Sequence, residues 1–440
     1  MSTAATHPWL ENLLAGRPEL PAQPQAWLSR LRADALERAN SLALPTLRDE
    51  DWRFTDLAPL YALTLKPAVQ AAALAGLGLE PVIAPEAPAR LVFIDGQFVP
   101  SRSSIQRDGV VVTTLGAALE THGRLVESHL GQHAGFRNDP FRAINTVHLT
   151  DGALVVAPRN AAGSTPIQLI FASTQAGVAV HPRCLIVAEA GSEVTVLEDY
   201  VGLHGGAYCV NAVTEIAVGA NAHVRHIRRQ QESPAAFHIA TCAVRLERDA
   251  SYKSVSVAVG ARLSSYNLNV LQAGEGTHCQ IDGLALLNER QLGDTHSFID
   301  HAHPHGTSRQ LHKCVAGGHA HAVFNGRILV RPGAQRTDSS QSSRNLLTSR
   351  RAHVDTKPQL EIFADDVKCT HGATVGQIDE TALFYMKSRG VNRDMARRLL
   401  TYAFAADVLE TLEVDELKVS LEQMTMDRFT NPSDSRTVER

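Results

Sequence analysis

The alternation of apolar and polar residues divides the chain into a helical beginning, a long region of short strands and a helical end. In residues 22–42, apolar side chains recur on one helical face among Arg, Glu and Gln, which predicts an N-terminal helix. From about residue 90 to 360, Val, Ile, Leu and Thr alternate with polar residues over short stretches, as is typical of strands. Because no amphipathic helix of about ten residues separates these strands, the pattern disfavours a βαβ arrangement.

Turn residues recur at a nearly regular interval within the strand region. A glycine followed five positions later by a strand residue occurs at Gly191, Gly219, Gly276 and Gly318, with looser copies at Asp249 and Gly333. The interval from Gly191 to Gly219 suits one coil of a β-solenoid, in which each rung buries its apolar face against the next. A β-sandwich or a double-stranded β-barrel also contains evenly spaced short strands. We predict the solenoid and keep these two folds as alternatives.

Beyond residue 375 the hydrophobic period returns to that of helices. Asp379 is expected to cap a helix that Gly390 ends, and Asn392 to cap a second helix. Apolar residues form two rows on this second helix, so that it is either buried on two sides or meets another protein along one row. A third helix is expected over Val414–Phe429. The two rows are Met395, Leu399, Tyr402, Ala406 and Leu409, and Leu400, Phe404, Val408 and Leu412.

These patterns predict four regions. They are an N-terminal helical region with a linker (residues 1–88), a β-helix core (residues 89–368), a C-terminal helical domain (residues 369–430) and a disordered tail (residues 431–440).

Charge and composition narrow the class of protein. The 440 residues include 42 Lys and Arg against 46 Asp and Glu, without a long basic run, which argues against nucleic-acid binding. There is no secretory leader and no run of about 18 apolar residues, so we expect a cytoplasmic protein that does not enter a membrane. The six cysteines form no CxxC pair, which disfavours a zinc ribbon or a self-contained iron–sulfur site; most are predicted to be buried small hydrophobic residues.

Common catalytic motifs are missing from the sequence. No GxxxxGK[ST] loop or GxSxG elbow occurs, and the stretch Gly76–Pro81 fails the GxGxxG pattern at its last position. The chain is therefore expected not to be an enzyme of a common class.

A histidine-rich stretch is one candidate for metal chemistry. On a strand, His301, His303 and His305 would share a face, although Pro304 disfavours a central strand there. Three imidazoles and a carboxylate suit Zn or Fe, but the spacing matches no known zinc signature. A polar ladder without metal is favoured over a metal-dependent hydrolase or oxygenase. The stretch contains His296, His301, His303, His305, His312, His319 and His321.

Cys369 and His371 are the second candidate. Two positions apart on an extended segment, they project to the same side, and thiolate and imidazole both ligate iron. Lys368 is expected to favour the thiolate. Two ligands do not hold an iron–sulfur cluster, so the pair is either structural or is completed by ligands from a partner.

Three blocks of sequence resemble the SufD type of the SufB/SufD family, the scaffold subunits of the SUF iron–sulfur cluster assembly machinery. The most specific block lies near the C-terminus, and the resemblance spans most of the chain. The blocks are Glu50–Thr55 with Leu57; His301, Pro304–His305, Ser308, Gln310, Lys313, Ala322–Gly326 and Ala334–Asp338; and Pro358–Gly376, Asp379–Glu380, Leu383–Tyr385 and Ser388–Gly390.

This resemblance implies a mainly β fold, a right-handed parallel β-helix flanked by N-terminal and C-terminal helical regions. It also implies a non-enzymatic scaffold that works with SufB and with SufC, an ABC-type ATPase that would hydrolyse ATP on its behalf. The chain lacks the clustered cysteines of SufB-like proteins, which favours the SufD type. A purely architectural partner of SufB is the alternative.

The resemblance also assigns residues. His371, with Cys369 beside it, would lie where SufB meets this chain and would hold a transient iron–sulfur cluster; no cofactor would be bound permanently. SufC would dock on the second C-terminal helix. The exposed edge of the solenoid makes a homodimer of the isolated chain plausible. The residues expected to contact SufC are Met395, Leu399, Leu400, Phe404 and Val408.

Overall fold

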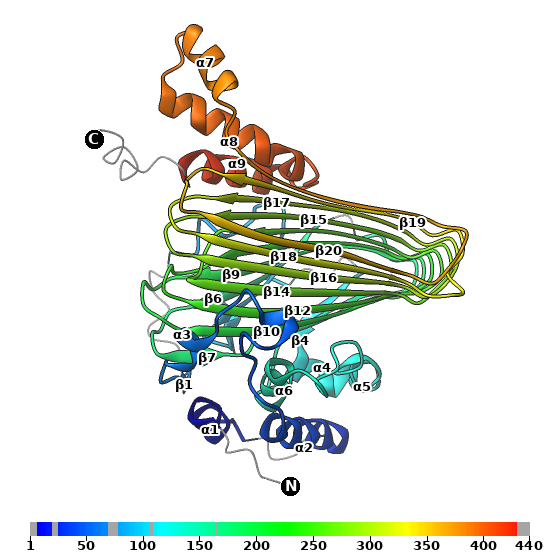
Figure 1. The fold of residues 1–440 in the computed structure, drawn as a ribbon. Coiled ribbons are helices and arrows are strands. Elements are labelled where there is room, and N and C mark those ends of the chain that lie inside the picture. Colours follow the sequence, from blue (N-terminus) through cyan, green and yellow to red (C-terminus); the bar gives the residue numbers. More distant parts are fainter. Residues whose placement is uncertain (1–6, 20–24, 69–77, 106–108, 164, 429–440) are drawn as a thin grey trace.

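The computed structural model describes residues 7–19, 25–68, 78–105, 109–163 and 165–428. Its centre is a parallel β-helix in which two sheets face each other, with helices at both ends (Figure 1). Strands of one sheet alternate along the chain with strands of the other, and hydrogen-bonded neighbours are mostly two elements apart. The predicted solenoid is therefore confirmed, and the sandwich and barrel alternatives are wrong.

From β8 onward one sheet consists of even-numbered and the other of odd-numbered strands, so we call them the even sheet and the odd sheet. Short β1 (Lys66–Pro67) pairs with β7 (Val178–Val180), which pairs with β10. The even sheet runs β20 (His353–Ile362), β18 (His321–Val330), β16 (Leu292–His301), β14 (Leu263–Gln272), β12 (Phe237–Leu246), β10 (Cys209–Val218), β8 (Arg183–Ala188), β5 (Ala153–Ala157) and β4 (Val111–Thr114). The odd sheet runs β21 (Lys368–Gln377), β19 (Asp338–Leu347), β17 (Thr307–Ala316), β15 (His278–Leu287), β13 (Ser251–Ala258), β11 (His223–Gln231), β9 (Glu193–Gly202), β6 (Ile167–Ser173), β2 (Ala89–Ile94) and β3 (Gln97–Phe98).

The period of the rungs is close to the one expected from the turns. In the odd sheet from β9 to β21, each position pairs with the position one coil later, as in Ser251↔His278 and Thr307↔Asp338. Of the four predicted turn glycines, Gly191, Gly276 and Gly318 have a positive φ, which glycine adopts without steric penalty. At the Gly219 turn the positive φ belongs instead to Asn221.

Helices close the N-terminal end of the rod. The predicted helix of residues 22–42 is α2 (Ala26–Ser41), and it packs with α1 (Pro8–Ala15) and α6 (Pro140–Val147) in an apolar cluster that covers the first rungs. The helices between β4 and β5 lie inside the range predicted to be only β-helix, which the sequence pattern missed because these helices are short. The short elements here are η1 (Glu50–Trp52), α3 (Ala58–Tyr61), η2 (Pro100–Arg102), α4 (Leu115–Thr121) and α5 (Gly123–His129).

The C-terminal helices begin later than predicted. Residues 368–377 form β21, which pairs with β19 along its whole length, so the β-helix ends near residue 377 and not at 368. The helices are α7 (Glu380–Ser388), α8 (Arg393–Leu409) and α9 (Asp415–Arg428), and Asp379 and Asn392 cap the first two as expected. α8 and α9 pack against the outer face of the odd sheet, and α7 projects beyond the rod (Figure 1).

Two predicted segments lie wholly or partly outside the residues that the structure describes. The expected disordered tail, residues 431–440, lies outside the described residues, as does part of the predicted linker, residues 69–77. Within the described ranges, no helix combines the length and the apolar character needed to span a bilayer.

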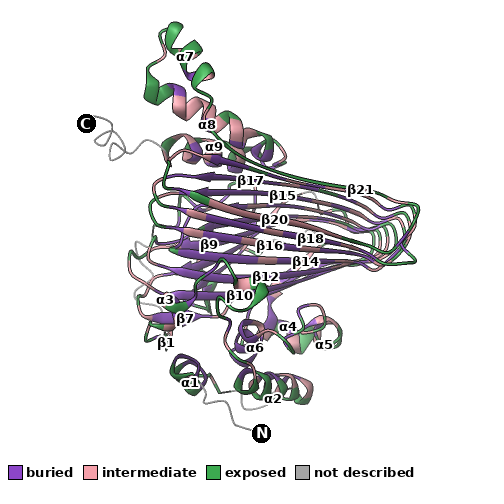
Figure 2. Cartoon of the chain, in the orientation of Figure 1, coloured by how far each residue is buried: buried purple, intermediate pink, exposed green. Residues whose placement is uncertain are grey.

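Burial falls from one end of the rod to the other. The strands near the N-terminal helices are buried throughout, as in β6, whereas β21 has one half-buried residue and is otherwise exposed. Figure 2 shows this gradient, together with the exposure of α7. The C-terminal end of the rod is therefore open.

Candidate functional site

Cys369 and His371 lie on β21, the terminal strand of the odd sheet. Cys369 is in register with Ser339 and His371 with Gln341, and Ser339 and Gln341 are both buried between the two sheets. Because register partners in a parallel sheet project to the same face, Cys369 and His371 also point toward the lumen of the rod. In the described part of the chain no rung follows β21, so His371 is exposed and Cys369 is half-buried.

The thiol of Cys369 is not activated by its sequence neighbour. Burial raises the pKa of Cys369, a hydrogen bond with the backbone of Ser339 opposes this shift, and the charge of Asp338 adds to it. Lys368 is exposed and, as the preceding residue of a strand, projects to the opposite face. The expectation that Lys368 favours the thiolate is therefore wrong.

A polar lumen begins directly beneath these two residues. Gln341 donates to Gln310 over 2.8 Å, and Gln310 exchanges hydrogen bonds with Ser297 of the opposite sheet. A second path joins Ser339 to Ser308 over 2.6 Å and Ser308 to His301 over 3.0 Å. Hydrogen-bonded side chains thus lead from the open end toward the middle of the rod.

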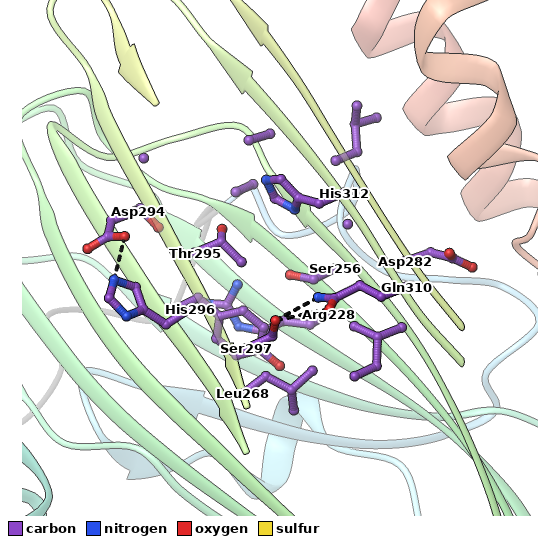
Figure 3. A pocket seen from close by; sticks show the side chains of 18 residues that line it. Arg228, Ser256, Leu268, Asp282, Asp294, Thr295, His296, Ser297, Gln310 and His312 are labelled. Carbon is purple, nitrogen blue, oxygen red and sulfur yellow. Dashed lines mark hydrogen bonds and ion pairs between the residues drawn. The ribbon is translucent and has the colours of Figure 1, made fainter. Parts of the chain in front are cut away.

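Farther in, the lumen contains a small cavity of about 30 Å³, space for roughly two water molecules. Figure 3 shows Gln310 and Ser297 meeting here, with His312 nearby. His312 stacks on Phe324 with ring centroids 4.7 Å apart, and burial lowers its pKa to about 4, so the imidazole is neutral. A Cβ at Gly283 would lie 2.6 Å from Nδ1 of His312, so the glycine makes room for the ring.

Charged groups are buried deeper in the lumen. Glu198 binds His226 over 3.0 Å and also accepts from Tyr200 and Thr214. Although burial opposes it, the hydrogen bond and charge of His226 hold the pKa of Glu198 below its ordinary value. Arg228 lies over the ring of Tyr266, 4.3 Å from its centroid. This network leaves no signal in the sequence, because its members come from different rungs and form no local motif.

The histidine-rich stretch does not form one site. His301 and His312 face the lumen, whereas His296 faces outward and pairs with Asp294 over 2.8 Å. Asp294 also accepts from Thr55, so it joins the N-terminal Glu50–Thr55 segment to the rod. Although burial opposes it, Asp294 raises the pKa of His296.

The expected shared strand face of His301, His303 and His305 is wrong as well. β16 ends at His301, and the next two histidines lie in the turn that follows, where His305 has a positive φ. Pro304 and Gly306 belong to this turn. The geometry therefore gives no support to a metal-dependent enzyme built from this stretch.

The residues expected to contact SufC differ in exposure. Met395 is exposed, whereas Leu399, Leu400 and Phe404 are intermediate. Val408 is fully buried in the cluster that joins α8 to the rod, so in this conformation it is an internal packing residue. On α7, Phe384 is 73% and Tyr385 59% exposed, both more than Met395 at 38%. These two aromatic residues are not among those predicted from the sequence to contact SufC.

Comparison with known families agrees with the fold. A family described as "SUF system FeS cluster assembly, SufBD core domain" matches residues 171–404, and the "SufBD protein N-terminal region" matches residues 15–169. The chain belongs to the SufB/SufD family. Its role accordingly lies in iron–sulfur cluster assembly in the SUF system.

Individual relatives of the SufB/SufD family cover almost the whole chain. An iron–sulfur cluster assembly SufBD family protein of Synechocystis is 39% identical over 89% of this chain and 89% of the relative. The SufD of Escherichia coli is 33% identical over 92% of this chain and 96% of the relative, and that of Bacillus subtilis is 27% identical over 91% and 93%. These relatives support the SufD type within the family.

Proposed function

We propose that this SufBD chain is a non-enzymatic scaffold subunit that assembles iron–sulfur clusters in the cytoplasm together with SufB and SufC. The observation that carries the proposal is the open end of the rod, where a thiol and an imidazole occupy a strand that no further rung covers in the described part of the chain. Neither residue completes a metal site alone, which is what a site shared between two subunits requires.

The open end also offers a surface for SufB. β20 and β21 are the last strands of their sheets, and an unpaired strand edge is a template for pairing with another chain. Exposed apolar side chains accompany this edge, with Ile362 at 40%, Phe363 at 62% and Val375 at 49% exposure. The same surface would pair two copies of the isolated chain when SufB is absent.

Cluster assembly on this surface needs ligands from both subunits. A [2Fe–2S] or [4Fe–4S] cluster takes four protein ligands, usually thiolates. Cys369 and His371 would supply up to two, and SufB would supply the others. Metal binding would also stabilise the thiolate of Cys369 against the burial that raises its pKa.

The C-terminal helices would receive SufC. α7 presents Phe384 and Tyr385, and the first turns of α8 present Met395. ATP would act only through SufC, in keeping with the missing GxxxxGK[ST] loop. α8 is joined to the rod by Lys313, which donates to Asp407 over 2.5 Å and to the carbonyl of Phe404 over 2.6 Å. Dimerisation of nucleotide-loaded SufC would pull on this helix and shift the β-helix pair, provided that SufC binds the two arrangements with different affinity.

The ligand role is tested by His371→Ala in a complex reconstituted with SufB and SufC. We expect cluster formation, followed by absorbance after addition of iron and sulfide, to slow at least tenfold while the complex still assembles on size exclusion. His305→Ala, which changes an exposed histidine in a turn, is the matched control and is expected to behave as wild type. Normal cluster formation by His371→Ala would favour the purely architectural alternative.

The docking role is tested by Phe384→Asp with Tyr385→Asp. We expect the double variant to lose SufC and to retain SufB in a co-purification, because two charges replace the exposed aromatic surface. Val419→Asp on α9, where the side chain is 64% exposed, is the control. Retention of SufC by the α7 variant would indicate that SufC docks on Met395 and Leu400 of α8 and not on α7.

A further inference from the structure

Two histidines and an aspartate meet on the outer face of the even sheet, away from the lumen. His321 begins β18 and His353 begins β20, and the two are register partners. Asp355 lies two positions after His353 and so shares its face of the strand. The Nε2 of His321 is 2.7 Å and the Nε2 of His353 is 3.1 Å from Oδ2 of Asp355.

Two of the three separations between donor atoms, those from the histidines to Asp355, are close to the spacing of a coordination shell. With metal–ligand bonds of about 2.1 Å, neighbouring ligand atoms are about 3.0 Å apart in octahedral and about 3.4 Å apart in tetrahedral geometry. The ligand atoms of the three residues all lie within 4.8 Å of one another. We propose that His321, His353 and Asp355 form a binding site for a single divalent first-row transition metal ion.

The donor set decides the class of ion. Imidazole nitrogen suits Zn(II) and Fe(II), and two histidines with one carboxylate leave coordination positions open for water or another ligand. The oxygen-rich shells of Ca²⁺ and Mg²⁺ do not match two imidazoles. The site therefore takes a zinc-like or iron-like ion in exchangeable form, with positions left for a further donor.

The surroundings hold the ligands in place and leave the ion accessible. β18 is paired with β16 on one side and β20 on the other, which fixes His321 and limits its movement. The side chains of His321 and Asp355 are 27% and 23% exposed, whereas that of His353 is 67% exposed. The neighbouring His319 is engaged by Arg351 and is not part of the set.

This site is separate from the corner at Cys369 and His371. Those residues begin β21 of the odd sheet and face the lumen, whereas His353 and Asp355 begin β20 of the even sheet and face outward. The histidine-rich stretch of the sequence contributes only His321. The inference stands on the isolated chain and is independent of the roles proposed for SufB and SufC.

The test uses the purified full chain, stripped with a chelator and titrated with Co(II) at pH 7.5. We expect about one equivalent to bind with the visible absorption bands of a Co(II)–imidazole site, and Zn(II) to displace it. His353→Ala and Asp355→Asn are expected to weaken Co(II) binding at least tenfold. His353 is the preferred change because its exposed side chain contributes little to folding, and circular dichroism with thermal unfolding verifies the fold.

Two controls keep the assignment specific. His305→Ala removes another exposed histidine near a carboxylate, with its Nε2 3.8 Å from Glu275, and is expected to leave binding unchanged. The double variant Cys369→Ala with His371→Ala is also expected to bind one equivalent. The proposal is overturned if the wild-type chain binds no Co(II), if His353→Ala binds as wild type, or if the double variant loses the ion.

Discussion

The two halves of the rod enclose very different interiors. Near the N-terminal helices the first rungs have a mainly apolar lumen, in which the rings of Phe93, Phe171 and Tyr200 stack on successive rungs at 5.2 and 5.3 Å, and the hydroxyl of Tyr200 donates to the buried Glu198. Near the open end the lumen is lined by amides and hydroxyls, among them Gln341 and Ser339. The same parallel coil therefore supports both an apolar core and a polar channel of hydrogen bonds.

The stably packed half of the rod and the candidate functional site lie at opposite ends of the rod axis. Burial of apolar area contributes about 25 cal/mol per Å², and the N-terminal half combines such burial with a helical cap. The terminal rungs bury less and end in unpaired strands, which places them at the low-stability end of the molecule. The groups proposed to meet a partner are located where the fold depends on them least.

The largest expected difference between the two halves is the loss of unfolding free energy when one partner of an ion pair is removed. Arg183 and Glu215 form a fully buried ion pair over 2.5 Å, and Glu215 also accepts from the backbone of Gly131, His133 and Ala134. Glu215→Gln leaves Arg183 unpaired and is expected to lower the free energy of unfolding in urea by about 3 kcal/mol.

The matched change at the open end is Glu361→Gln, which removes one partner of the half-exposed pair with Arg327. It is expected to lower the free energy of unfolding by less than about 1 kcal/mol. Equal losses from the two variants would contradict the proposed gradient of stability.

The stabilisation of the fold by Glu215 is expected to depend on pH. Although burial opposes it, the charge of Arg183 and three backbone hydrogen bonds hold the pKa of Glu215 below its ordinary value. The stabilisation is therefore complete above the unfolded-state pKa of about 4.3 and is lost as the pH falls through the lower folded-state value. The difference between wild type and Glu215→Gln in urea should shrink over that acidic range. A constant difference would contradict the assignment.

A Val→Ala substitution made once in each half of the rod is expected to have an intermediate effect on the free energy of unfolding. Val155→Ala removes buried methyl groups from β5 and is expected to lower the free energy of unfolding by about 2 kcal/mol. Val375→Ala on β21, where the side chain is 49% exposed, should change it by less than about 0.5 kcal/mol. Comparable values in urea denaturation would show that the terminal rung is packed as tightly as the first.

The smallest effect concerns thiol reactivity and leaves the fold unchanged. Cys369 is half-buried and the other five cysteines are buried, so iodoacetamide should label Cys369 first. Because burial raises its pKa, labelling should accelerate as the pH approaches 9 and stay slower than that of a free thiol at pH 7.5. Peptide mass spectrometry locates the label, and early modification of Cys184 would show that the apolar half opens more readily than the terminal rung.

Much of the architecture was predictable because it repeats. Turn residues such as Gly191 and Gly276 mark each coil, and the helix caps Asp379 and Asn392 follow local rules. The predicted burial of most cysteines is confirmed. The boundary near residue 377 was missed because β21 ends in small and exposed residues, which lack the apolar signature of a strand.

The candidate sites were less predictable from the sequence, because the register between neighbouring strands determines which side chains meet. Cys369 and His371 share a strand face by simple alternation, but their position at an open end follows from the number of rungs that precede them. His321 meets Asp355 only because β18 and β20 align one full coil apart, with His321 opposite His353. Sequence spacing does not show which residue of one coil will lie beside a given residue of the next.

The attachment of α8 determines how far the proposed pull of SufC would have to travel through the rod. Lys313 anchors this helix on β17, and β21 follows two rungs later, a distance of about 10 Å along the axis at the usual strand separation. Only two ladders of parallel hydrogen bonds lie between the anchor and the terminal thiol. A force applied to the helix therefore loads the last two coils of the rod, while the long apolar stack behind them serves as a rigid base.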